Sequence, residues 1–155
     1  MKFITDRNLG KLVKWLRILG YDTVFYTETI DRNFLRVGSK EGRIVLTRRR
    51  DMALRDFSGR MVIIYRDRVY DQIEELIEKA SLHPNPQNFF SLCLECNQPL
   101  HPISRKTAAE KVPPYVFQTQ NTFLSCPECG KIYWPGTHKD NILRQLKEHN
   151  LFRRP

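Results

Sequence analysis

The sequence predicts an α/β fold, in which a small parallel sheet flanked by helices precedes a cysteine-rich module. Within residues 1–82, short apolar runs alternate with amphipathic stretches, as in chains that form parallel sheets with helices on both faces. A proline-rich break follows at residues 83–86, and four cysteines lie beyond it. We therefore expect an α/β domain over residues 1–82 and a second module over residues 83–155.

The first element is a short apolar run that ends at the carboxylate of Asp6. An amphipathic helix is predicted directly behind it, and Gly20 is a natural end for that helix. Its apolar face comprises Leu9, Leu12, Val13, Leu16 and Leu19. The ends of strands in open α/β sheets are where ligands and catalytic groups gather. Asp6 is therefore a candidate site residue, although it could equally serve only to cap the helix.

The remaining elements follow from the same patterns. Strands are predicted at 23–26, 44–47 and 61–65, and helices at 31–40, 52–57, 69–82 and 139–149. The run Ile44-Val-Leu-Thr47 is almost wholly apolar, as expected of a strand covered on both faces. In the helix at 69–82 we expect Glu74, Glu75 and Glu78 to face water.

The chain is basic throughout, with 26 lysines and arginines, 17 acidic residues and a net charge of +9. Both predicted modules carry an excess of positive charge. Such a surface favours polyanionic partners, so nucleic acid is the leading partner class. A basic enzyme with a small anionic substrate would have a similar composition.

The sequence begins without the pattern of a signal peptide, and no apolar run approaches the ~18 residues of a membrane span. We expect a soluble, cytoplasmic protein without a membrane partner. No feature of the sequence indicates an oligomeric state.

The cysteines Cys93, Cys96, Cys126 and Cys129 form two Cys-x-x-Cys pairs. Four thiolates bind Zn²⁺ tetrahedrally and stabilise a segment that has little core of its own, so we expect structural zinc in a module like a zinc ribbon. Gly130 suits a turn with positive φ after the second pair. A catalytic zinc, a redox dithiol, or replacement of one ligand by His101 or His138 are the alternatives.

Acidic residues follow the predicted strands. In a parallel sheet the loops after the strands open on one edge, so Asp6, Asp31 and Asp51 could meet there and bind Mg²⁺ or Mn²⁺. Glu28 and Asp67 follow strands in the same way. The alternative is a set of helix caps, since Asp31 and Asp51 both stand at predicted helix starts.

Basic residues accompany these acids. Arg7, Lys11 and Lys14 share one face of the first helix and could bind phosphates leading to Asp6. Arg48, within the run Arg48-Arg49-Arg50, adds positive charge at the same edge. A solvated helix face would carry similar charges, and the arginines could instead pair with nearby acids.

Four stretches together resemble one known family. They are residues 3–23 (Phe-Ile-Thr-Asp-Arg-Asn-Leu-Gly onward), 41–48, Cys93 to Asn97, and Cys126 to His138. The sequence is similar in these stretches, and in their order, to the Mut7-C ribonuclease domain family. The resemblance implies a PIN-like nuclease fold joined to a C-terminal zinc ribbon, and metal-dependent cleavage of RNA by acidic residues at the strand ends.

One position departs from the family pattern. That pattern after the third strand resembles Thr-Arg-Asp-x-Asp, and here it is Thr47-Arg-Arg-Arg-Asp51, so that Arg49 replaces an acid. A guanidinium beside a metal site lowers the affinity for the cation.

We therefore predict a metal-dependent endoribonuclease, with Asp6, Asp31 and Asp51 as metal ligands and Arg7, Lys11, Lys14 and Arg48 in contact with RNA. The main alternative is a non-catalytic RNA-binding protein that keeps the fold and the zinc. A third interpretation is an adaptor whose zinc module docks a protein partner.

Overall fold

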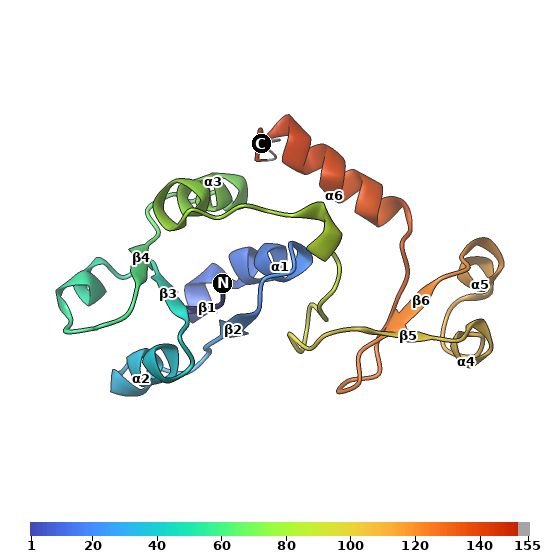
Figure 1. Cartoon of the computed structure of the whole chain (residues 1–155), viewed down its shortest axis with the longest axis horizontal. Helices are drawn as coiled ribbons and strands as arrows, with labels where there is room; N and C mark the ends of the chain where they lie inside the picture. The colour runs from blue at the N-terminus through green and yellow to red at the C-terminus, as the bar shows by residue number, and fades with distance from the viewer. Residues whose placement is uncertain (152–155) are drawn as a thin grey trace. The chain divides into compact units, whose positions relative to one another are not determined.

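Four short strands form a parallel sheet in the first part of the chain, and the computed structural model describes residues 1–151 (Figure 1). The strands are β1 (Phe3–Thr5), β2 (Thr23–Phe25), β3 (Ile44–Thr47) and β4 (Met61–Ile63). They lie in the order β2-β1-β3-β4, and all neighbours are parallel. This confirms the predicted sheet. The fourth strand ends at Ile63 rather than Tyr65.

Helices cover both faces of this sheet. They are η1 (Arg7–Leu9), α1 (Gly10–Ile18), α2 (Arg32–Lys40), η2 (Arg50–Leu54) and α3 (Val69–Ala80). Helices α1 and α3 contact each other on one face, and α2 lies on the other (Figure 1). On the α2 face, Ile4 and Val45 from the central strands pack with Phe34 and Met52 in one buried cluster. In place of the helix predicted at 52–57, the structure has the 3₁₀ helix η2, which begins two residues before the predicted start.

The chain divides into two compact units, Met1–Phe89 and a second that begins at Phe90. Residues 83–89, which we placed in the second module, therefore belong to the first unit. The segment belongs to the first unit because Asn88 packs closely against Gly20 at the end of α1. A Cβ at Gly20, where φ is +87°, would lie 2.3 Å from the Asn88 carbonyl oxygen, so only glycine allows the segment to return over the end of α1.

The carboxylate of Glu75 on α3 is buried rather than facing water, which corrects our expectation for this residue. It accepts hydrogen bonds from the backbone N–H groups of Tyr65 and Arg66, each at 3.2 Å, and from Lys79. Burial alone would raise the pKa of Glu75, but these donors bring it below its ordinary value of 4.5. Glu75 thus fixes the loop after β4 to α3.

We expect Glu75→Gln to lower the free energy of unfolding by about 1–3 kcal/mol at neutral pH, because two N–H donors and an ammonium lose an anionic partner. Since the pKa is lower in the folded state, this stabilisation is present above the unfolded value of 4.5 and is lost as pH falls through the folded pKa. Urea unfolding of the wild type and of Glu75→Gln across pH 3–7 measures this difference in the free energy of unfolding. The control Glu78→Gln lies on the same helix with its side chain exposed, and an equal loss there would contradict the assignment.

The second unit contains a small antiparallel sheet in the order β5-β6-β7. Its strands are β5 (His101–Ile103), β6 (Phe123–Ser125) and β7 (Ile132–Tyr133), and its helices are α4 (Arg105–Ala108), α5 (Pro114–Thr119) and α6 (Thr137–Glu148). Helices α4 and α5, which the sequence did not predict, fill the connection between β5 and β6. The predicted last helix begins earlier, at Thr137.

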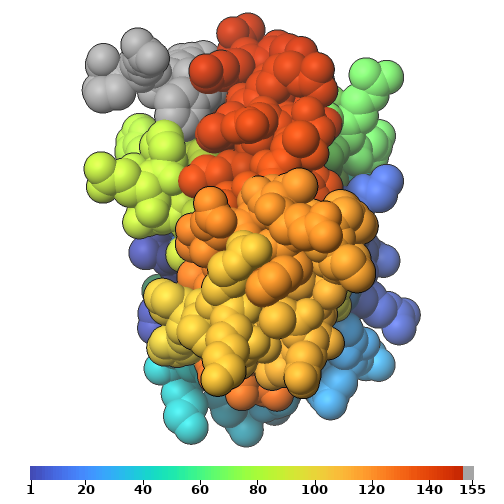
Figure 2. All heavy atoms as spheres, turned by 90° about the vertical axis from the view of Figure 1, so that its right-hand side faces the viewer, coloured from blue at the N-terminus to red at the C-terminus, as the bar shows by residue number. Residues whose placement is uncertain are grey.

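The buried cluster of this unit is small: Ala108, Val112, Val116, Phe123 and Ile132. In the space-filling view of Figure 2, the yellow and orange segments of the unit form a continuous surface. A cluster of this size supplies little hydrophobic stabilisation for the number of residues ordered, so a further cross-link is expected. Within the described part of the chain, none of the helices combines the length and apolar character needed to span a membrane.

Candidate functional site

Asp6 lies at the carboxyl end of β1, and its side chain is fully buried. One carboxylate oxygen, Oδ1, accepts a hydrogen bond from the backbone N–H of Asn8 at 2.8 Å. The other, Oδ2, accepts from the Thr47 hydroxyl at 2.7 Å and from the Arg48 backbone N–H at 3.2 Å. A buried carboxylate is tolerated only when such donors replace water. Asp6 is therefore more than a helix cap, because two of its three donors come from the end of β3.

The strand order places Asp6 at the switch point of the sheet. From β1 the chain first moves to β2 on one side, and then crosses back to β3 on the other side. In open α/β sheets, ligands bind beyond the carboxyl ends of the strands at this point. Thr47, at the end of β3, donates to Asp6 and accepts from the Arg49 backbone N–H at 3.1 Å. The hydroxyl thus holds the carboxylate in one orientation.

Asp31 and Asp51 make local interactions. Asp31 caps α2, where its Oδ1 accepts from the backbone N–H groups of Asn33 at 2.9 Å and Phe34 at 3.3 Å. Asp51 forms a two-pronged ion pair with Arg49, with Nε–Oδ1 and Nη2–Oδ2 distances of 3.1 and 2.7 Å. The hydrogen bonds and charge of Arg49 lower the pKa of the Asp51 carboxyl.

The structure does not gather Asp6, Asp31 and Asp51 into one group. Among residues 1–151, the cluster of three or more potential metal-ligating side chains consists of the four cysteines. Asp6 has three donors on its two oxygens, and Asp51 is occupied by Arg49. As arranged here, these carboxylates do not fit a ready-made site for Mg²⁺ or Mn²⁺, which takes several oxygen ligands in near-octahedral geometry.

The predicted basic stripe is exposed. Arg7 lies on η1, and Lys11 and Lys14 lie on α1, each with an exposed side chain. Within the described residues, none of the three has an ion-pair partner. Arg48 differs from them. Its guanidinium donates to the Asp67 carboxylate at 2.6 Å and to the Arg66 carbonyl oxygen, so it ties the end of β3 to the loop after β4.

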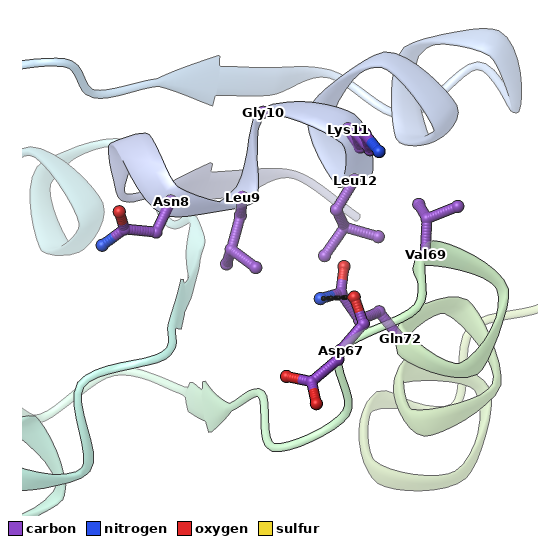
Figure 3. A pocket seen from close by; sticks show the side chains of 8 residues that line it. All are labelled: Asn8, Leu9, Gly10, Lys11, Leu12, Asp67, Val69 and Gln72. Carbon is purple, nitrogen blue, oxygen red and sulfur yellow. Dashed lines mark hydrogen bonds between the residues drawn. The ribbon is translucent and has the colours of Figure 1, made fainter.

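A pocket of about 330 Å³ lies between the start of α1 and the segment after β4 (Figure 3). Its lining comprises Asn8, Leu9, Gly10, Lys11, Leu12, Asp67, Val69 and Gln72. Gln72 on α3 is 6% exposed and donates to the carbonyl oxygens of Arg66 at 2.9 Å and Asp67 at 3.4 Å. The pocket wall is connected to the Asp6 site through Arg48, which contacts Asp67 by its side chain and Asp6 by its backbone.

The four cysteines converge in the second unit, and their Sγ atoms all lie within 4.8 Å of one another. The Sγ atoms of Cys93 and Cys129 are 3.8 Å apart. Four sulfurs around Zn²⁺ at ~2.3 Å would be separated by about 3.8 Å, so the cluster fits tetrahedral zinc. His101 and His138 are outside this group, and a site closed by four sulfurs leaves no open position for catalysis.

Two matching turns present the sulfurs. After each pair, a backbone N–H donates at 2.9 Å to the carbonyl oxygen of the first cysteine, from Asn97 to Cys93 and from Gly130 to Cys126. Asn97 and Gly130 have φ of 62° and 75°, as predicted for Gly130. Burial raises the pKa of the Cys93 thiol, but hydrogen bonds from Tyr133 and from backbone N–H groups bring it down to about 7. Burial and the neighbouring cysteines raise the pKa of Cys96 to about 12, so without a metal the thiolate is favoured at Cys93 and the proton at Cys96.

Comparison with family models gives a match to the Mut7-C RNAse domain over residues 1–146, which is nearly the whole chain. The chain belongs to the Mut7-C RNase domain family. No curated protein and no solved structure matches it. The family match spans both units, so the parallel sheet and the cysteine cluster are parts of one Mut7-C domain, and the family indicates a nuclease-type function acting on RNA.

Two residues of this Mut7-C domain were missed by sequence reasoning. Thr47 ends an apolar strand and gives no local sign that its hydroxyl contacts Asp6. Gln72 could have been found, because it is a polar residue next to Ile73 on the apolar face of a helix, where burial of an amide needs an explanation.

Proposed function

We propose that this Mut7-C domain is a metal-dependent endoribonuclease that cleaves RNA at the carboxyl edge of its parallel sheet, with Asp6 as the central carboxylate. The observation that carries the proposal is the fully buried position of Asp6 at the switch point, held by donors from η1 and β3. Membership of an RNase domain family supports it. A PIN-like fold and a zinc ribbon belong to the same proposal.

In this proposal the chain contributes binding and orientation. Arg7, Lys11 and Lys14 contact phosphates along η1 and α1, and the Thr47 hydroxyl holds the Asp6 carboxylate in place. As arranged, the carboxylates do not fit a divalent ion, so binding one requires them to rearrange first. For Asp51 to become a ligand, it must first release Arg49.

The Arg49–Asp51 ion pair favours a second candidate, an RNA-binding protein that does not cleave. A guanidinium that holds the carboxylate by two hydrogen bonds occupies the oxygens that a cation would need. In this candidate the basic edge still binds RNA, and the zinc module remains structural.

Cleavage of labelled single-stranded RNA separates the two. We expect the wild type to cleave with Mn²⁺ and to stop with EDTA. We expect Arg49→Asp to raise the rate by about tenfold, because it frees Asp51 and adds an acid near the site. Arg60→Asp is the matched control, since it makes the same charge change on an exposed residue before β4, at the opposite edge. RNA binding without cleavage by the wild type and by Arg49→Asp would establish the second candidate.

A further inference from the structure

Tyr65 is a large aromatic residue left half-exposed at the carboxyl edge of the sheet, with 50% of its surface accessible. It lies directly beyond β4, just as Asp6 lies beyond β1 and Arg50 beyond β3. Because all four strands are parallel, these three residues come from loops on one edge. Half of Tyr65 is thus accessible to a ligand at this edge.

We propose that Tyr65 and Arg50 form a platform for single-stranded RNA: Arg50 moves from its place over the ring to the adjoining phosphate, and a nucleobase stacks on the Tyr65 face that Arg50 leaves. The inference deepens the proposed function and rests on it, because it assigns the form of RNA that the edge accepts. Proteins that bind single strands combine exposed aromatic rings with basic side chains in this way.

Two cations lie against the Tyr65 ring and differ in what else they contact. The Arg50 guanidinium carbon is 5.0 Å from the ring centroid, and the Lys79 ammonium is 4.7 Å from it. Lys79 also donates to Glu75 and to the Ile63 carbonyl oxygen. Arg50 has no acidic partner among residues 1–151. The charge of Lys79 is therefore offset by Glu75, and that of Arg50 is available for a phosphate.

The platform is held in place before any RNA binds. The backbone N–H of Tyr65 donates to both carboxylate oxygens of Glu75, a buried residue of α3. Lys79 connects the same carboxylate to the ring. A ring fixed in this way loses little conformational entropy when a base stacks on it.

Stacking also restricts the substrate. A base can lie on an aromatic ring only if it is unstacked from its neighbours, as in single strands, loops and ends, whereas bases in an A-form duplex are inaccessible to such a ring. The platform therefore predicts a preference for single-stranded RNA over duplex RNA, based on the faces of the bases rather than on their sequence.

Binding of the full-length chain to a short fluorescent single-stranded RNA in EDTA tests this by anisotropy. We expect Tyr65→Leu to weaken binding by about tenfold, within the range for loss of one stacked base, and Tyr65→Phe to bind like the wild type. Tyr115→Leu is the matched control, because Tyr115 is an exposed tyrosine of the second unit. Arg50→Gln should reduce the slope of log affinity against log salt by about 0.7, the value for one phosphate on a single strand.

An abasic strand of the same length removes the stacking partner, so the wild type should bind it as weakly as Tyr65→Leu binds the normal strand. Equal affinities of wild type and Tyr65→Leu for the normal strand would overturn the platform and leave RNA binding intact. An equal loss in Tyr115→Leu, or equal binding of normal and abasic strands, would also overturn it. Failure of the wild type to bind RNA at all would overturn the proposed function as well.

Discussion

Replacing Cys126 with serine is expected to unfold the second unit and to release the zinc that we propose for it. The Cys126 sulfur is one of four that lie within 4.8 Å of one another, and this residue is almost fully buried. Structural zinc in comparable small modules contributes an apparent ~10–16 kcal/mol, far more than the small apolar cluster around Phe123 could replace. A serine hydroxyl is a poor substitute for a thiolate ligand.

Metal analysis and two-dimensional NMR of the full chain measure this result. We expect about one zinc per chain in the wild type and loss of dispersed signals from the second unit in Cys126→Ser, with the same loss after strong chelation. Glu128→Ser is the matched control, since it introduces serine at an exposed position of the same turn. A folded, zinc-free second unit in Cys126→Ser would contradict the zinc assignment.

The second large effect is expected from Asp6→Asn, which should lower RNA cleavage by about 10²–10⁴-fold, the range for removal of a group that handles a proton or a reacting water. If the oxygen of the new asparagine amide accepts from the Asn8 N–H, the NH₂ group of the same amide must face the Arg48 N–H. Two donors then oppose each other. The variant should therefore also lose about 1–3 kcal/mol of stability.

Cleavage rates at a temperature well below the unfolding midpoint keep these two effects apart. Asp56→Asn, at an exposed aspartate before β4, provides the control for loss of a negative charge. If Asp6→Asn is folded and cleaves at the wild-type rate, the buried carboxylate has only a structural role and the catalytic residues lie elsewhere.

The elements of the first unit were predictable because their patterns are local. Leu12 and Leu16 repeat at helical spacing, and the apolar run of β3 indicates a strand buried on both faces. Gly130 after the second cysteine pair likewise indicates its turn. Each of these signals depends on neighbours only a few positions away in the chain.

The candidate site was less predictable because its contacts are not local. The Thr47 hydroxyl that donates to Asp6 lies 41 positions further along the chain, and only the strand order brings the two residues together. The burial of Glu75 depends on the loop at Tyr65, and the spacing of apolar residues within α3 gives no information about that loop. The Arg49–Asp51 pair is close in sequence, yet whether the two face each other depends on the 3₁₀ turn at η2.

The central position of β1 affects how the protein folds. It is the first strand in the chain, but it pairs on both sides, with β2 and with β3. The pairing with β3 closes a long loop, a step whose entropic cost precedes any gain from contacts. Two of the three donors to Asp6 arrive only with that pairing. Before β3 docks, Asp6 lacks these two donors, so a nascent or partly folded chain cannot assemble the Asp6 site ahead of the completed sheet.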